Sequence, residues 1–233
     1  MKKELISLVN ETKEIELVDY DDLFIELTNS TLFLKLAYFG DVSEININAN
    51  VNENAHLNIV FADFSSSNLN TCVKINLNGI EGTCDWKLAT LAHKKENKKF
   101  DISFIHNKEK TSAVMDNYGV SKDESSITFS GVNHIKEKCV KSITRQNAKI
   151  IVFDEKAKGN ASPILKIDEN DVIASHGAVV GQISDEHLFY LMSRGLTKEE
   201  ARELIIKGYL SPVSSYFSSE VKSRIETAIG EGL

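Results

Sequence analysis

A single histidine, His176, stands where a side chain could do metal chemistry. It follows a short predicted strand, 172–175, and precedes Gly177, and a second glycine comes at Gly181. Because glycine allows sharp changes of backbone direction, the sequence predicts a turn at 175–177 from which the imidazole projects. A neutral imidazole there could bind a metal ion or a metal cluster. A histidine that hydrogen-bonds nearby backbone is the alternative.

The carboxylates and thiols carry weaker signals. Asp168 and Asp171 are close in sequence, and paired carboxylates can hydrolyse a glycan when they flank a groove, but their polar surroundings favour a solvated turn. The three cysteines, Cys72, Cys84 and Cys139, are odd in number and form no C-x-x-C pair. We therefore predict free thiols in a reducing compartment.

Composition and missing motifs argue against several function classes. The chain has no G-x-x-x-x-G-K-[ST], G-x-S-x-G or H-E-x-x-H motif, which are the signatures of phosphate loops, serine hydrolases and zinc proteases. A net charge of −7, from 27 basic and 34 acidic residues, disfavours a nucleic-acid or anionic-membrane partner. No apolar run approaches the roughly 20 residues of a membrane span, and the N-terminus lacks a signal-peptide core. We expect a cytoplasmic protein without membrane or nucleic-acid partners.

The segment 1–183 consists of short, strand-like apolar runs. Apolar residues alternate with polar ones at 45–51, 57–61 and 73–77, the period of a strand with one buried face. Strand centres recur roughly every 10 to 15 residues, and no proline precedes Pro163, so nothing interrupts a hydrogen-bonded ladder. The many asparagines form either a ladder inside the structure or a solvated polar face.

Two architectures suit this pattern. One is an antiparallel sandwich or barrel, and the other is a β-solenoid whose coils stack on one another. The Asn78-Gly79 dipeptide is the only tight-hairpin signal, and strands do not flank it at hairpin spacing. This scarcity of tight turns favours the β-solenoid.

Helical spacing replaces the strand pattern after residue 183. A first helix, capped by Ser184 or Asp185, should end at Gly195 in a left-handed conformation. Its apolar residues are Leu188, Phe189, Tyr190, Leu191 and Met192. Such short helices are unstable alone, so they must pack on the β body, on each other or on a partner. We divide the chain into a β core, 1–183, and a helical region, 184–233.

A capping box opens the second helix, because Thr197 and Glu200 can satisfy each other's backbone amides. We predict that this helix ends at Gly208 and Pro212. Its expected apolar stripe is Ala201, Leu204, Ile205 and Tyr209. A last amphipathic helix carries Val221, Ile225, Ala228 and Ile229.

Two segments of the chain resemble a known family. The segment 175–202, SHGAVVGQISDEHLFYLMSRGLTKEEAR, resembles the C-terminal signature of the SufB/SufD iron–sulfur cluster assembly proteins, and 129–172 is similar to that family's core. The resemblance implies a mainly β fold, a right-handed parallel β-helix (a β-solenoid) followed by C-terminal α-helices. It also implies a non-enzymatic scaffold subunit. In this family SufB and SufD pair through their β-helices, and their C-terminal helices dock a SufC-type ATPase.

The version of the signature is SufD-like. SHGA-x-VGQ matches SufD, and 144–147, the strand that matches the cluster cysteine of SufB, contains no cysteine. His176 matches the SufD histidine proposed to hold a nascent cluster at the subunit interface. The resemblance therefore implies a transient iron–sulfur cluster at His176 and no tightly bound cofactor. Typical members carry an N-terminal helical region, so we expect a short form that pairs with a SufB-like subunit or with itself as a homodimer.

Docking of the ATPase is expected on the first two helices. The residues expected to make this contact are Leu188, Phe189, Tyr190, Met192, Arg194 and Leu204. Two other functions stay open at this point. One is a β-helix carbohydrate-active enzyme, and the other is a structural subunit that never contacts a cluster.

Overall fold

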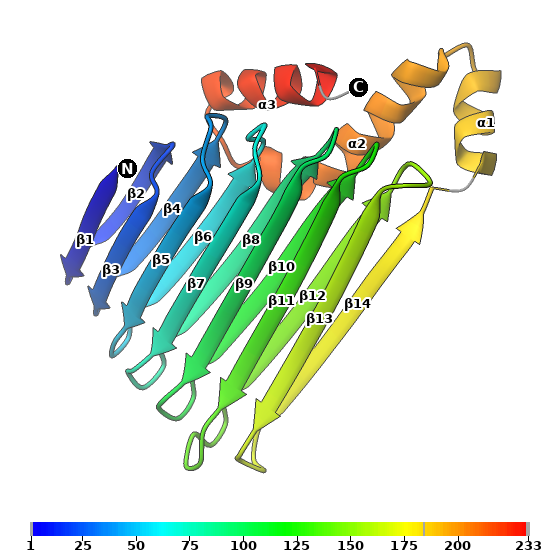
Figure 1. Cartoon of the computed structure of the whole chain (residues 1–233). Helices are drawn as coiled ribbons and strands as arrows, with labels where there is room; N and C mark the ends of the chain where they lie inside the picture. The colour runs from blue at the N-terminus through cyan, green and yellow to red at the C-terminus, as the bar shows by residue number, and fades with distance from the viewer. Residues whose placement is uncertain (1, 184, 232–233) are drawn as a thin grey trace.

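Successive strands alternate between two parallel sheets that wind into a β-solenoid (Figure 1). The computed structural model describes residues 2–183 and 185–231. The first sheet contains, in spatial order, β1 (Lys3–Val9), β3 (Asp22–Thr28), β5 (Glu44–Val51), β7 (Leu69–Leu77), β9 (Asn97–His106), β11 (Ser126–Ile135) and β13 (Lys158–Ile167). The second contains β2 (Thr12–Val18), β4 (Thr31–Tyr38), β6 (His56–Asp63), β8 (Thr83–Ala92), β10 (Ser112–Ser121), β12 (Ile143–Val152) and β14 (Ile173–Gln182). Parallel pairing throughout excludes the antiparallel sandwich and confirms the predicted β-solenoid.

Period-2 alternation places one apolar side chain of every pair inside the solenoid. Register then stacks like residues from coil to coil, as in the buried row Leu23, Ile47, Val73 and Ile102. Aromatic rings fill the middle of the core: the Phe61 ring centroid lies 5.5 Å from that of Trp86 and 6.2 Å from that of Phe100, and the Phe100 centroid lies 5.6 Å from that of Phe129. Stacked rows of this kind bury a continuous core without disulfides.

The coils lengthen along the chain. In the first coil Lys3 pairs with Asp22. Near the end of the solenoid Ser126 pairs with Lys158, which is farther away along the sequence. Both the strands, from 7 residues in β1 to 10 in β11, and the corner loops become longer, and many corner residues adopt positive φ. The changing coil length explains why the sequence shows only a loose period.

Several asparagines form a hydrogen-bonded ladder on the outside of the first sheet. Asn50 donates to Glu26 at 2.8 Å, and Asn76 donates to Asn50 at 3.1 Å. Asn107 continues the same pattern by donating to Asn78 at 2.8 Å. These side chains are therefore neither an internal ladder nor independently solvated groups, and they link successive coils at the surface.

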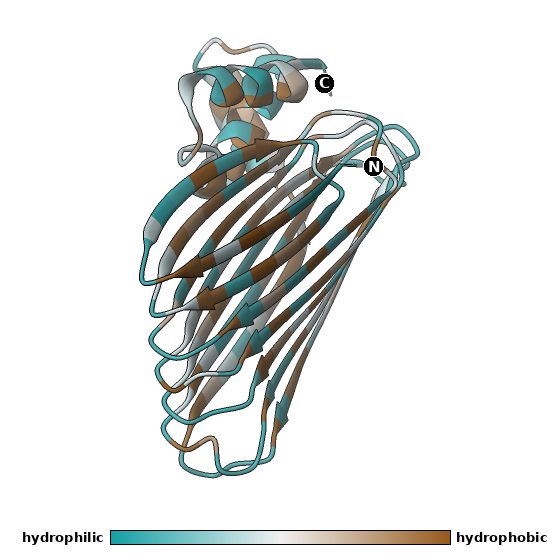
Figure 2. Cartoon of the chain, turned by 90° about the vertical axis from the view of Figure 1, so that its left-hand side faces the viewer, coloured by the Kyte–Doolittle hydropathy of each residue, from teal (hydrophilic) through white to brown (hydrophobic). Residues whose placement is uncertain are grey.

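Three helices follow the solenoid: α1 (Asp185–Ser193), α2 (Lys198–Ser214) and α3 (Ser219–Glu231). Figure 2 shows them gathered at one side of the strands. α2 and α3 cover the outer face of the second sheet, whose residues there are apolar. The residues that α2, α3 and the link between them contribute to this second core are Ile206, Leu210, Val213, Phe217, Val221, Ile225 and Ile229. In the described part of the chain, no helix is both long enough and apolar enough to cross a membrane.

Two local predictions are wrong. Ser175, His176 and Gly177 lie within strand β14 and form no turn. Helix α2 continues to Ser214, past the expected stop at Pro212, because packing of its last two turns on the second sheet outweighs the proline. Proline cannot supply an amide hydrogen to the Gly208 carbonyl, and the Ser211 hydroxyl donates to that oxygen instead, at 2.8 Å.

The structure confirms most of the predicted helix caps. Gly195 has φ of +98°, as its predicted left-handed role requires, and the Thr197 capping box is formed. Ala201 is buried as expected, but Leu204 is half exposed, and the buried stripe instead runs through Ile206, Leu210 and Val213. Of the predicted caps of the first helix, Ser184 and the side chain of Asp185 lie outside the described residues.

Candidate functional site

The C-terminal end of the solenoid is an open surface. β13 and β14 are the last strands of their sheets, and no described strand pairs with their outer edges. Such an edge exposes unpaired backbone amides and carbonyls, which makes it a template for another strand. Five large apolar side chains are exposed on these two strands: Ile164, Ile167, Ile173, Val179 and Val180. The combination of unpaired edges and exposed apolar residues is typical of a protein interface.

His176 lies in the middle of this open end. Its register partner in the preceding coil is Gln146, which in turn pairs with Met115. Gln146 and Met115 are buried, so His176 occupies a row that faces the interior in earlier coils. The histidine itself is exposed because no further coil covers it. The structure thus places the predicted residue at the rim of the solenoid, on a strand instead of a turn.

The polar groups beneath His176 belong to the solenoid interior. Gln146 Nε2 donates to the Gly131 carbonyl at 3.2 Å, while its Oε1 is buried without a hydrogen-bond partner among the described residues. Asn133 Nδ2 donates to Thr144 Oγ1 at 2.7 Å. No group of three or more His, Cys, Asp or Glu side chains that could hold a metal ion occurs in the described chain. His176 can therefore supply one ligand, and a metal centre here needs ligands from elsewhere.

The paired carboxylates do not form a hydrolytic site. Asp168 Oδ2 lies 2.6 Å from His134 Nε2 at the surface, and this hydrogen bond lowers the pKa of Asp168. Asp171 is exposed at the turn before β14. The sequence-based preference for a solvated turn agrees with this placement, and the geometry gives no support to glycan hydrolysis.

A second exposed surface lies on α1 and the start of α2. The side chains of Phe189, Tyr190, Met192 and Leu204 are 74%, 57%, 44% and 50% exposed. The Arg194 guanidinium lies 5.3 Å from the centroid of the Tyr190 ring. An apolar cavity of about 480 Å³ adjoins them; its lining includes Ile151, Ile183, Leu191 and Ile205. Of the predicted docking residues, only Leu188 is half-buried.

One ion pair anchors α2 to the solenoid. Arg202 Nη2 donates to both carboxylate oxygens of Asp154 at 3.0 Å, and its guanidinium lies 4.9 Å from the Phe153 ring centroid. Asp154 also accepts from the amide of Asp123 at 2.7 Å. Although burial opposes it, these hydrogen bonds lower the pKa of Asp154. Sequence reasoning missed this contact, because its partners are far apart along the chain.

The two surfaces are separate but adjoining. His176 lies within β14. α1 begins shortly after that strand ends (Figure 1). The solenoid rim and the exposed helical surface are therefore joined by only a short stretch of chain. The pairing of 143–152 with 173–182, which places Gln146 below His176, has no local sequence signal.

Comparisons with a family profile and with individual proteins point to the same family. The profile of the family described as "SUF system FeS cluster assembly, SufBD core domain" matches residues 41–209. The chain is 37% identical to iron–sulfur cluster assembly protein SufD of Bacillus subtilis (strain 168) over 155 residues, covering 66% of this chain and 36% of that protein. It is 28% identical to SufB of the same strain over 148 residues, covering 60% of this chain and 32% of SufB.

A third relative extends the comparison to another genus. An iron–sulfur cluster assembly SufBD family protein of Staphylococcus saprophyticus is 28% identical over 134 residues, covering 54% of this chain and 29% of the relative. The chain therefore spans about a third of the length of the curated relatives that it matches.

Proposed function

Because the chain belongs to the SufBD core family of SUF-system iron–sulfur cluster assembly proteins, we propose that it is a SufD-like, non-enzymatic scaffold subunit of a Suf-type complex. The observation that carries this proposal is the open end of the solenoid, with His176 exposed on a row that is interior elsewhere. In this proposal the iron–sulfur cluster is the product that the complex builds. The cytoplasm suits it, since Cys72, Cys84 and Cys139 are all free thiols.

Pairing is assigned to the open end. A partner strand that adds to β13 or β14 satisfies the unpaired backbone groups of those edges. It also covers the apolar side chains of Ile164, Ile173 and Val179, which are 53%, 57% and 62% exposed. A SufB-like subunit and a second copy of this chain both fit this description, and the identity of the relatives favours the SufB-like subunit.

Docking of a SufC-type ATPase is assigned to α1 and α2. Large aromatic and apolar side chains that stand exposed together are the usual anchors of a protein interface. Exposed side chains on α1 include Phe189, Tyr190 and Met192, and the apolar cavity of about 480 Å³ lies between this helix and α2. The Arg202–Asp154 ion pair supports the assignment, because it fixes α2 to the β12–β13 corner. A force applied to the helices would thus reach the last coil.

Cluster contact is assigned to His176. The imidazole supplies one nitrogen ligand at the rim, and the remaining ligands come from the paired subunit, since the described chain has no metal-binding group of its own there. Pairing would therefore bring the ligand set together, and separation of the subunits would release the cluster. This arrangement also explains why no tightly bound cofactor is expected.

The docking proposal is tested by co-purification with a SufC-type ATPase. Met192→Asp and Phe189→Asp place a charge in the expected apolar contact, which should reduce ATPase recovery at least tenfold. Phe24→Asp is the matched control, because Phe24 and Met192 are both 44% exposed and Phe24 lies on the first sheet. Undiminished recovery with both helix variants would contradict the docking assignment.

The cluster proposal is tested by anaerobic reconstitution with iron and sulfide in the presence of a SufB-like subunit. We expect His176→Ala to lose most of the cluster absorbance while size-exclusion chromatography shows intact pairing. His56→Ala serves as the control, since His56 is also an exposed strand histidine and hydrogen-bonds to Thr83 in the neighbouring coil. Equal cluster absorbance in the wild type and in His176→Ala would contradict the role of His176 and would favour a structural subunit that does not contact the cluster.

A further inference from the structure

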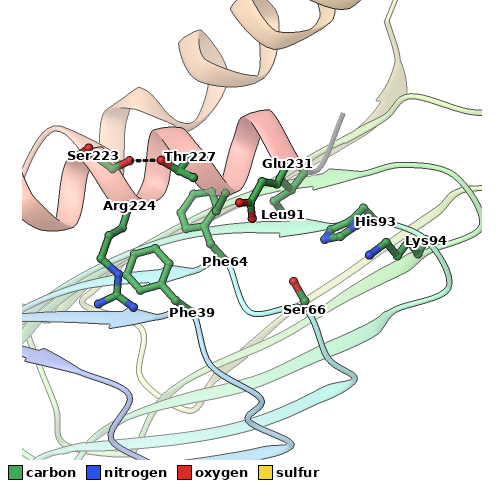
Figure 3. A pocket seen from close by; sticks show the side chains of 11 residues that line it. Phe39, Phe64, Ser66, Leu91, His93, Lys94, Ser223, Arg224, Thr227 and Glu231 are labelled. Atoms are coloured by element: carbon green, nitrogen blue, oxygen red, sulfur yellow. Dashed lines mark hydrogen bonds between the residues drawn. The ribbon is translucent and has the colours of Figure 1, made fainter.

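A cavity of about 320 Å³ lies between α3 and the corner of the solenoid, away from both surfaces described above (Figure 3). Its apolar wall consists of Phe39, Phe64 and Leu91, and the two phenyl rings stack with centroids 6.5 Å apart. α3 supplies the opposite wall, including Arg224 and Thr227. A volume of this size is at the lower end of the range for small-molecule sites.

Positive charge exceeds negative charge in this cavity. Arg224 and Lys94 line it, and neither forms an ion pair with a carboxylate in the described part of the chain. Glu231 is the one carboxylate among the lining residues. Burial, aided by nearby lysines, lowers the pKa of His93 and so disfavours the charged form of its ring. Among the described lining residues, two cationic side chains therefore face one carboxylate, although the whole chain has a net charge of −7.

Arg224 is held in position to bind. Its guanidinium lies 4.1 Å from the centroid of the Phe39 ring, the shortest such distance among the cation–ring contacts of the described residues. Stacking on a ring leaves the N–H edge of a guanidinium free to donate, and that edge matches the geometry of a carboxylate or phosphate. An exposed arginine that is ordered by a ring loses less side-chain entropy when it binds an anion.

The far wall is also fixed. His93 Nε2 lies 3.2 Å from Glu96 Oε1, and the His93 amide donates to Glu96 Oε2 at 3.0 Å. Behind Glu96 lies the buried Lys98, whose ammonium is 2.9 Å from Asp63. The histidine side of the cavity is thus tied to a rigid interior network, so the cavity does not depend on a mobile loop.

We propose that this cavity binds a small organic anion, whose carboxylate or phosphate pairs with Arg224 and whose apolar body packs on Phe39, Phe64 and Leu91. This inference is independent of the proposed role in cluster assembly. Such a ligand lies between α3 and the solenoid, so it would stabilise the position of the last helix.

The test is a titration of the whole ¹⁵N-labelled chain, followed through the backbone amide signals of the lining residues Phe64, Leu91 and Ala228, which all the variants below retain. Benzoate and phenyl phosphate are the probes, because they share an aromatic body and differ in their anionic group. Inorganic phosphate offers the charge alone, and benzylamine offers the body with the opposite charge. We expect millimolar or tighter binding of benzoate or phenyl phosphate, and at least tenfold weaker binding of the two controls.

Variants separate the two parts of the site. Arg224→Gln should weaken probe binding at least tenfold, and Thr227→Phe should do the same by filling the cavity while leaving Arg224 in place. Arg145→Gln, which removes an equal charge from an exposed strand position, should leave binding unchanged. Absence of binding, equal binding by Arg224→Gln, or equal binding of benzylamine or inorganic phosphate would each overturn the proposal.

Discussion

Replacing Asp63 by alanine should destabilise the solenoid more than any surface change, because it would strand a buried charge. Asp63 and Lys98 are both fully buried inside the coils, and Lys98 Nζ lies 2.9 Å from Asp63 Oδ2. The same carboxylate oxygen accepts from Thr90 Oγ1 at 2.6 Å, and its other oxygen accepts from the amide of Ser65 at 3.1 Å. The carboxylate is thus paired and fully hydrogen-bonded, as a buried charge must be.

The expected cost follows from what is left behind. Removing one partner of a buried ion pair costs about 3–5 kcal/mol, because the other charge stays in a low-dielectric interior. The Ser65 carbonyl, 2.7 Å from Lys98 Nζ, cannot replace the lost charge. For a chain of this length, about 4 kcal/mol corresponds to a fall in Tm on the order of 10 °C. Replacing both partners by apolar residues removes the stranded charge, so Lys98→Met in the Asp63→Ala background should recover about 2 kcal/mol.

The assay is urea unfolding followed by the fluorescence of Trp86. This is the only tryptophan of the chain, and it is fully buried, with its Nε1 donating to Asn117 Oδ1 at 2.9 Å. Asp101→Ala is the control, since Asp101 is exposed on the outer side of β9. If Asp63→Ala costs no more than this control, or if Lys98→Met adds a further loss to it, the ion pair does not have the role assigned here.

Two further predictions concern single contacts. Arg202→Ala should cost about 1 kcal/mol near neutral pH. The pKa of Asp154 is lowered in the folded state. The stability that the ionised carboxylate contributes is therefore present above its ordinary pKa near 3.8 and is lost as the pH falls through the lower folded-state pKa. When unfolding is measured from pH 7 to pH 2, Arg202→Ala should lose less stability on acidification than the wild type does. Gly79→Ala should cost about 3 kcal/mol, because a Cβ there would overlap the backbone of Glu53, whereas Gly181→Ala, with open space around it, should change thermal stability by less than about 0.5 kcal/mol. Equal effects of the two glycine substitutions would contradict this account of the coil corner.

Local patterns predicted the elements well where local chemistry decides them. The capping box at Thr197 and the left-handed Gly195 are satisfied by neighbouring atoms, and both were found from sequence. The alternation at 45–51 and 73–77 likewise became strands with one buried row. Resemblance to the SufB/SufD family, more than residue pattern, identified His176 as the residue of interest, and no local signal showed that it lies on a strand.

Predictions failed where a distant part of the chain decides the outcome. A glycine can end a strand or helix, or it can lie within one. Gly177 lies within β14 because that strand pairs with β12 of the preceding coil. Helix α2 runs past Pro212 because Leu210 and Val213 are buried against the second sheet. In both places tertiary packing outweighs a local preference worth only a few kcal/mol.

The amino-acid sequence by itself determined the strands, the helices and the family, since period and caps act over a short stretch of chain. Only the tertiary structure decided which side chains meet. Lys98 joins Asp63, and Arg202 joins Asp154, although the partners are far apart along the chain. The coils lengthen from the first pair of strands to the last, so no constant spacing connects these partners. Their contacts exist because the backbone ladders set the register of each coil against the next.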